Sequence, residues 1–154
     1  MSFYPSLKSI VGRRIGLAST GNLVASPNGS DIAITPPCVD ASITVGAENA
    51  NVRPITIQLK DANGDDIAYA ELVKLYVFTN ATRQALGTGG STGIAIGTDG
   101  TILITHTAKL IFELISEADG DIDLTWTDTG TESVVLGLLL PNGRWVMSDA
   151  IANT

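Results

Sequence analysis

The sequence has very few of the side chains that build metal, disulfide or catalytic sites. Its 154 residues include one cysteine, Cys38, and one histidine, His106. A single cysteine excludes an intramolecular disulfide framework and a cysteine-built zinc site. A single histidine argues against a histidine metal centre or a catalytic triad, and we expect it at the surface near the end of a strand. Charged residues are also scarce, at 16%, compared with roughly a quarter in typical soluble domains.

Basic residues and long hydrophobic runs are scarce too. Lys and Arg total 9 against 16 Asp and Glu, for a net charge of −7. This balance excludes a general nucleic-acid binder, which needs a basic surface to displace the counterions of phosphate. The longest uncharged apolar run, residues 133–141, is less than half of the roughly 20 residues that a membrane helix needs. Residues 1–9 lack the apolar centre of an export signal, so we expect a soluble chain made in a reducing compartment.

No catalytic motif emerges from the residues that are present. The sequence has no G-x-S-x-G nucleophile elbow, and the glycines of residues 87–90 lack the Lys-Ser/Thr ending of a phosphate loop. Glu113, Glu117 and the acids of residues 119–123 could supply a glycosidase pair, but aromatics, which line carbohydrate sites, are only 5% of the chain. We predict that the protein is not an enzyme and uses no cofactor.

Two acidic stretches have the alternating oxygen ligands of a calcium loop. They are Asp61-x-Asn63-x-Asp65 and Asp119-x-Asp121-x-Asp123. Neither has the glycine that the loop requires, and the first has leucine where the bidentate glutamate belongs. We interpret the first stretch as a solvated turn and the second as the polar face of a strand, with no metal site. A weak cation site between subunits at residues 119–123 is the alternative.

From residue 55 onward, apolar and polar residues alternate with the period of two that is typical of β-strands. The alternation is clearest in residues 55–60 and 121–127. Turn signals such as Asn63-Gly64 and Asn142-Gly143 separate the strands. The predicted strands are residues 55–60, 72–79, 94–96, 101–106, 110–116, 121–127, 133–140 and 144–148. This spacing favours an all-β fold, an immunoglobulin-like β-sandwich of about seven to eight strands with an extended N-terminal arm.

Within the sandwich, the two tryptophans are expected in different places. Trp126 alternates with acidic and hydroxyl residues and is predicted to lie in the core. Trp145 fits either the core or an interface. Residues 87–93, rich in Gly, Thr and Ser, are predicted to form a flexible loop.

Charge divides the chain into two parts. Residues 1–30 carry a net charge of +3, and residues 31–154 carry −10. The first part is rich in Ser, Gly and Asn and has no sustained period, while Pro54 biases Arg53 away from helix. We predict an extended arm or docking segment over residues 1–50 and the β-sandwich over residues 51–154.

The basic and aliphatic residues of the arm are the candidate partner-binding residues. We interpret the arm as a tether that becomes ordered on an acidic surface of a neighbouring subunit or another protein, since disordered tails usually have fewer aliphatics. A disordered tail is the alternative. The candidate residues are Lys8, Ile10, Val11, Arg13, Arg14, Ile15, Leu17, Leu23 and Val24.

Four stretches resemble a group of small immunoglobulin-like structural proteins of tailed bacteriophages. They are PITIQLKDANG (residues 54–64), GIAIGTDG (93–100), EADGDIDLTWTDTG (117–130) and LPNGRWVMSD (140–149). The first is similar to the opening strand and turn of bacterial immunoglobulin-like modules. The resemblance spans about residues 53–151, rests on strand and turn patterns, and brings no catalytic residues with it.

The resemblance implies a virion protein that is made in the cytoplasm of the bacterial host. Its partners would be the major capsid protein or another virion protein, and it would act as a homo-oligomer. We expect a capsid decoration or cement protein on the head surface. The alternatives are a tail, head-fibre or baseplate component and a host-surface or glycan-binding module, the latter suggested by the loop at residues 87–93 and the acidic strand face. Neither nucleic acid nor a membrane is an expected partner.

Overall fold

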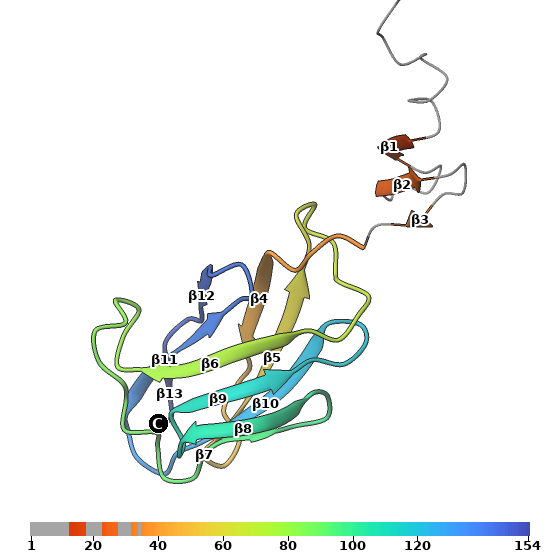
Figure 1. Ribbon diagram of the computed structural model, residues 1–154. Helices are drawn as coiled ribbons and strands as arrows, with labels where there is room; N and C mark the ends of the chain where they lie inside the picture. Colours follow the sequence, from red (N-terminus) through yellow and green to blue (C-terminus); the bar gives the residue numbers. More distant parts are fainter. Residues whose placement is uncertain (1–12, 18–22, 28–31, 34) are drawn as a thin grey trace, which may run out of the picture. The chain divides into compact units, whose positions relative to one another are not determined.

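The computed structural model describes residues 13–17, 23–27, 32–33 and 35–154 (Figure 1). The chain divides into two compact units, Met1–Pro37 and Cys38–Thr154. The described residues form strands, turns and loops without a helix, and within them no helix is long and apolar enough to cross a membrane. The predicted all-β class is confirmed.

In the first unit, three short strands pair with one another. They are β1 (Arg13–Leu17), β2 (Leu23–Pro27) and β3 (Ile32–Ala33), arranged in the antiparallel order β1-β2-β3. This part of the sequence has no sustained hydrophobic period, so these strands and their pairing were not predicted.

The second unit begins well before residue 51, where the sequence pattern placed the start of the sandwich. Residues 40–45 form strand β4 (Asp40–Val45), which pairs antiparallel with β5 (Val52–Lys60) along its whole length. Cys38, just before β4, is buried in the core. Residues 38–50 therefore belong to the sandwich and not to the segment that precedes it.

The second unit consists of two antiparallel sheets, in keeping with a β-sandwich. The small sheet has the order β4-β5-β10-β7, with β10 at Asp121–Thr127 and β7 at Gly93–Ile96. The large sheet has the order β12-β11-β6-β9-β8, and β13 also pairs with β11. Its strands are β6 (Leu72–Phe78), β8 (Thr101–Thr107), β9 (Ile111–Ile115), β11 (Ser133–Leu139), β12 (Trp145–Met147) and β13 (Ile151–Ala152). In Figure 1, β6, β9 and β8 cross in front of β5 and β10.

The core lies between the inner faces of these two sheets. Every second residue of a strand points inward, so β5 and β6 each supply three side chains that are at most 1% exposed: Ile55, Ile57 and Leu59 from β5, and Val73, Leu75 and Val77 from β6. Trp126 on β10 is fully buried, which confirms its predicted place. Removing this apolar surface from water, at roughly 25 cal/mol per Å², drives the two sheets together.

Residues 87–93 form a structured loop over the core and not a loose one. Gly90 has a φ of +65°, and a Cβ at this position would lie 2.8 Å from the indole of Trp126. Lys109 Nζ donates to the carbonyl oxygens of Gly90 at 3.3 Å and Ser91 at 2.6 Å. The Ser91 N–H donates to Asp128 Oδ1 at 2.9 Å. Gly90 therefore allows close packing against Trp126, and Gly89 and Gly93 allow the loop to pack against Lys109.

Substituting Gly90 tests this close approach, with Gly64 as a matched control. Both glycines have positive φ, but a Cβ at Gly64 would have no atom within 4 Å. Gly64→Ala should lose about 1 kcal/mol of unfolding free energy through backbone strain alone. Gly90→Ala should lose a further 1–3 kcal/mol or so, because its methyl group overpacks the core. Guanidinium unfolding of both variants measures the difference, and equal losses would contradict the packing role of the loop.

Candidate functional site

The calcium-like stretch after β5 is a turn held together by Asp61. Asp61 is 8% exposed, and its Oδ1 accepts the N–H groups of Asn63 at 2.8 Å and Asp65 at 3.0 Å. The Gly64 N–H donates to the carbonyl oxygen of Asp61 at 3.1 Å. A carboxylate that accepts backbone donors in this way organises a turn, so the interpretation of this stretch as a turn is confirmed.

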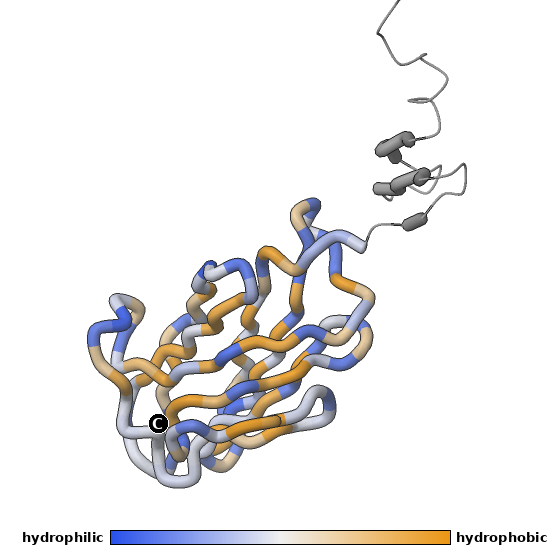
Figure 2. The backbone as a smooth tube through the Cα atoms, viewed as in Figure 1, coloured by the Kyte–Doolittle hydropathy of each residue, from blue (hydrophilic) through white to orange (hydrophobic). Residues whose placement is uncertain are grey.

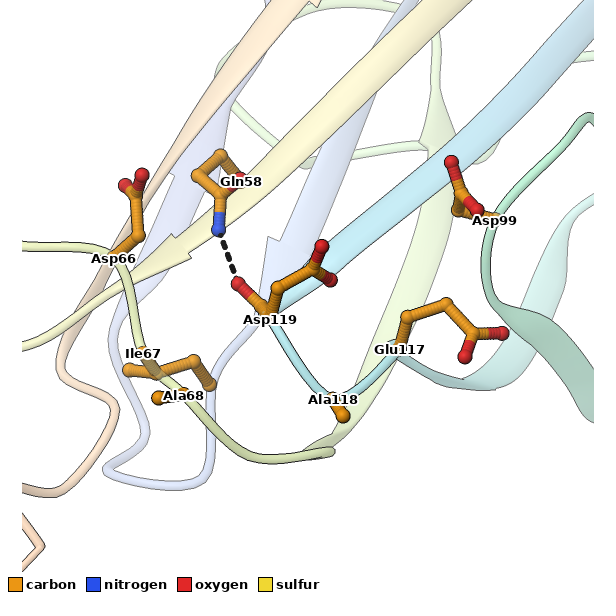
Figure 3. Close-up of a pocket in the computed structure, with 8 residues that line it drawn as sticks. All are labelled: Gln58, Asp66, Ile67, Ala68, Asp99, Glu117, Ala118 and Asp119. Atoms are coloured by element: carbon orange, nitrogen blue, oxygen red, sulfur yellow. Dashed lines mark hydrogen bonds between the residues drawn. The ribbon is translucent and has the colours of Figure 1, made fainter.

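Acidic residues that precede β10 or come from other loops, namely Asp66, Asp99, Glu117 and Asp119, border an open hollow that is drawn in Figure 3. Gln58 Nε2 donates to the carbonyl oxygen of Asp119 at 2.9 Å across this hollow. In Figure 3 the carboxylates of Asp66, Asp99 and Glu117 point in different directions. Within the described part of the chain, no three His, Cys, Asp or Glu side chains are placed to hold a metal ion. The acids are thus spread around a hollow and not gathered at one point.

Asp121 is the acidic residue whose ionisation the fold resists. Burial raises the pKa of Asp121, and the neighbouring carboxylates of Asp123, Asp119 and Asp99 raise it further. Its Oδ1 is buried and has no hydrogen-bond partner among the described residues. A charged carboxylate in such a place lowers the free energy of unfolding. The charge of Asp121 therefore destabilises the small sheet at neutral pH.

Replacing Asp121 by asparagine should therefore stabilise the protein at neutral pH. Because the pKa of Asp121 is higher in the folded chain than in the unfolded chain, stability falls as pH rises through the interval between the two values and stays lower above it. We expect Asp121→Asn to raise the Tm at pH 7, and the gain to vanish below about pH 3, where both forms are neutral. Asp65→Asn, at an exposed turn position, is the control and should leave the Tm unchanged. A lower Tm for Asp121→Asn at pH 7 would refute this view.

The outer face of the small sheet is polar, as expected for an antiparallel sheet with one face in water. Thr56 Oγ1 donates to Asp123 Oδ1 at 2.9 Å on this face, and Lys60 pairs with Asp66 at 2.7 Å. The register places hydroxyl, amide and carboxylate side chains side by side: Ser42, Thr44, Thr56, Gln58, Asp121, Asp123 and Thr125.

The outer face of the large sheet is very different and is here called the apolar face. Its residues alternate with the inward-pointing ones and share rows across the strands. They are Leu72, Tyr76, Phe78, Ile104, Ile111, Ile115, Val135, Leu139, Trp145 and Met147. Figure 2 shows apolar residues running along β6, β9 and β8 with few hydrophilic interruptions. Ile104 is 47% exposed and Leu72 43% exposed, so part of this apolar surface is in contact with water.

Three aromatic rings form a cluster at one end of the apolar face. Tyr76 and Phe78 stack with their ring centroids 5.8 Å apart and their planes 6° from parallel. Trp145 meets both rings edge-on, at centroid distances of 5.1 Å and 5.7 Å. Phe78 is buried but does not belong to the core cluster between the sheets. Trp145 therefore lies on the outer surface of the large sheet and not in the core between the sheets, and its place at an interface stays a prediction.

Arg83 covers this aromatic cluster from the loop that follows β6. Its Cζ lies 5.1 Å from the centroid of the Trp145 ring, a cation–π contact, and no carboxylate pairs with it among the described residues. The backbone of Arg83 has a φ of +61°, a left-handed conformation that is uncommon for residues other than glycine. The rings, Arg83, Thr82, Leu86 and Ile111 line a shallow hollow of about 520 Å³.

Charge on the strands of the large sheet is confined to one group of side chains. Lys74 Nζ lies 3.2 Å from Glu113 Oε1, and His106 Nε2 lies 3.1 Å from the same oxygen. The hydrogen bond from His106, followed by that from Lys74, lowers the pKa of Glu113. His106 lies near the end of β8 with its side chain 42% exposed, as predicted. The pairing of Lys74 with Glu113 leaves the apolar face nearly neutral.

The candidate residues of the N-terminal arm are separate from this surface in the sequence. Lys8, Ile10 and Val11 lie outside the described residues. The others lie on β1 and β2: Arg13, Arg14, Ile15, Leu17, Leu23 and Val24. Their role in binding a partner stays a prediction.

The apolar face was not predicted from the sequence, although two strands carry a signal for it. In β6 (LVKLYVF) and β11 (SVVLGLL), both alternating sets of residues are largely apolar. Strands of this kind are typically covered on both faces. The sequence interpretation assigned one apolar set of each strand to the core and made no prediction for the other set.

No protein-family model matches this sequence, and neither does any curated protein. The functional proposal therefore depends on the residues themselves, on the two faces of the sandwich and on the resemblance of the strand and turn patterns.

Proposed function

We propose that the protein is a non-enzymatic structural protein of a tailed bacteriophage virion, a capsid decoration or cement protein that binds and stabilises the head shell. The observation that supports this most is the apolar face of the large sheet. A contiguous apolar patch that stays exposed on a folded chain is often a site of protein association, and Leu72 and Ile104 of this face are 43% and 47% exposed. The strand and turn patterns that resemble phage proteins supply the setting.

The two antiparallel sheets support an immunoglobulin-like arrangement in particular. Sheets of this type pack over a core of alternating inward residues, often with a buried tryptophan. Here Trp126 on β10 takes such a place, fully buried between the sheets. The resemblance of residues 54–64 to the opening of an immunoglobulin-like module corresponds to β5, the long strand of the small sheet.

Binding would combine the apolar face with the basic N-terminal segment. A segment that becomes ordered on docking loses about 1–2 kcal/mol of backbone entropy per residue, and apolar burial must offset that loss. The aliphatic residues of 10–24 and the side chains of the apolar face are the sources of such burial. The +3 charge of residues 1–30 suits contact with an acidic capsid surface.

Antibody labelling of particles of the phage that encodes this chain tests the proposal. Label on the head supports decoration, label on the tail or baseplate supports the alternative virion location, and particles without label would refute a virion protein altogether. Deleting residues 2–30 should abolish binding to heads that lack the protein, while the Tm of the sandwich stays unchanged. Normal occupancy by the shortened chain would show that the arm is not the tether.

The hollow beside Trp145 favours a second function, a glycan-binding module on the host surface. An aromatic ring flanked by Arg83 and Thr82 offers an apolar platform with polar groups at its edge, a common plan for ligand sites. A glycan array probed with and without calcium tests this function. Binding that is lost in Trp145→Ala would support it, and the absence of binding under both conditions would remove it.

A further inference from the structure

We propose that a second copy of this chain covers the apolar face, and that the two copies pack face to face about a two-fold axis parallel to the strands, between β6 and β9. This inference rests on the assembly role proposed above and names the surface through which copies associate. Its basis is the strand register of the large sheet, which makes the apolar face complementary to itself.

One row of side chains across the large sheet contains the two paired charges. Leu139 on β11 lies opposite Lys74 on β6, Lys74 lies opposite Glu113 on β9, and Glu113 lies opposite Ile104 on β8. The order along the row is therefore apolar, positive, negative, apolar. The boundary between β6 and β9 divides this row into two halves of opposite charge.

A two-fold axis along that boundary places each half of the row over the other half of the second copy. The β6 strand of one copy then lies over β9 of the partner, and β11 lies over β8. Lys74 faces the partner's Glu113, and Leu139 faces the partner's Ile104. A two-fold axis perpendicular to the strands and passing through this row would instead place lysine over lysine and glutamate over glutamate, which like-charge repulsion disfavours.

The neighbouring rows obey the same rule. Tyr76 lies opposite Ile111 across β6 and β9, and Leu72 lies opposite Ile115. The axis between β6 and β9 therefore stacks Tyr76 on the partner's Ile111 and Leu72 on the partner's Ile115, apolar against apolar. A rotation of about 30° between packed sheets displaces side chains in proportion to their distance from its centre, so a rotation centred on the Lys74–Glu113 row displaces that row least.

The charge of the chain also favours this surface over others for a second copy. Residues 31–154 carry a net charge of −10, so two copies repel one another through most of their surfaces. On the strands of the large sheet the only carboxylate is Glu113, and it is already paired with Lys74, while Glu71 lies at the edge of the face beside Leu72. Two copies can approach there without placing unpaired acids against each other.

The size of the apolar face predicts a weak association. Four facing strands, each about 4.8 Å wide, and the six residue steps of β6 at about 3.4 Å give a footprint of roughly 20 Å by 20 Å. Stable interfaces bury about 800 Å² per partner, roughly twice that footprint. We therefore expect a dimer that dissociates on dilution and that other contacts in an assembly would reinforce.

Sedimentation velocity of the full chain over a concentration series tests the inference. Lys74→Glu makes the central charges of the row all acidic, and Glu113→Lys makes them all basic, so each variant alone should be monomeric where the wild type dimerises. An equal mixture of the two variants should dimerise again, because the acidic row of the Lys74→Glu chain then faces the basic row of the Glu113→Lys chain. A role of the Lys74–Glu113 pair within one chain cannot be rescued in this way, since each variant chain still lacks the pair.

Two controls keep the result clear. Lys60→Glu breaks the ion pair with Asp66 on the small sheet and should leave the dimer intact. The double variant Lys74→Glu with Glu113→Lys restores both the internal and the crossed pairs and should dimerise, which guards against misfolding of the single variants. A wild type that stays monomeric up to sub-millimolar concentration overturns the inference, and so does a dimer that the mixture fails to restore. Head labelling in a monomeric protein would leave the proposed function standing while refuting this interface.

Discussion

The structure depends on the packing of two inner sheet faces whose side chains recur at every second position. Ile57 of β5 and Leu75 of β6 are both fully buried, and each is flanked by residues that point away from the core. Since the core uses only one of the two alternating sets, the other set is free to serve a different purpose. The outer side chains of the small sheet are polar and face water, whereas the outer side chains of the large sheet are mostly apolar and contact one another.

The strands with clear alternation could be predicted, and the reason is physical. From residue 55 onward every predicted strand is present, with ends that differ by a few residues. Strand β4 was not predicted because it has only six residues, follows two prolines and lies in a stretch that was assigned to the N-terminal arm. Its strand character comes from pairing with β5 along its whole length, a long-range contact that local pattern does not contain. Strand β13 has two residues, too few for any period.

The candidate site was harder to predict than the fold, because its members come from distant parts of the chain. Tyr76 and Trp145 meet because β6 and β12 lie on the two sides of the same strand, β11. This strand order does not follow from the hydrophobic period of the sequence. The place of Trp145, which the sequence left open between core and interface, and the loop at residues 87–93, which was predicted to be flexible, both depend on such long-range contacts.

Electrostatics explains why that apolar surface lies on the large sheet. A cluster of acids repels its neighbours within a Debye length of about 8 Å at physiological salt, so a surface meant for close contact must be free of unpaired carboxylates. Several acids border the hollow beside Gln58 or lie on the small sheet, while Glu113, the one acid on the strands of the large sheet, is held by Lys74 and His106. Removing either cation would leave the Glu113 carboxylate less compensated on the apolar face. The Lys74–Glu113 pair contributes little to the stability of a single chain in which it is exposed. Its position at the centre of an otherwise apolar sheet face is better explained by the proposed dimer, in which the pair would fix the orientation of the second copy.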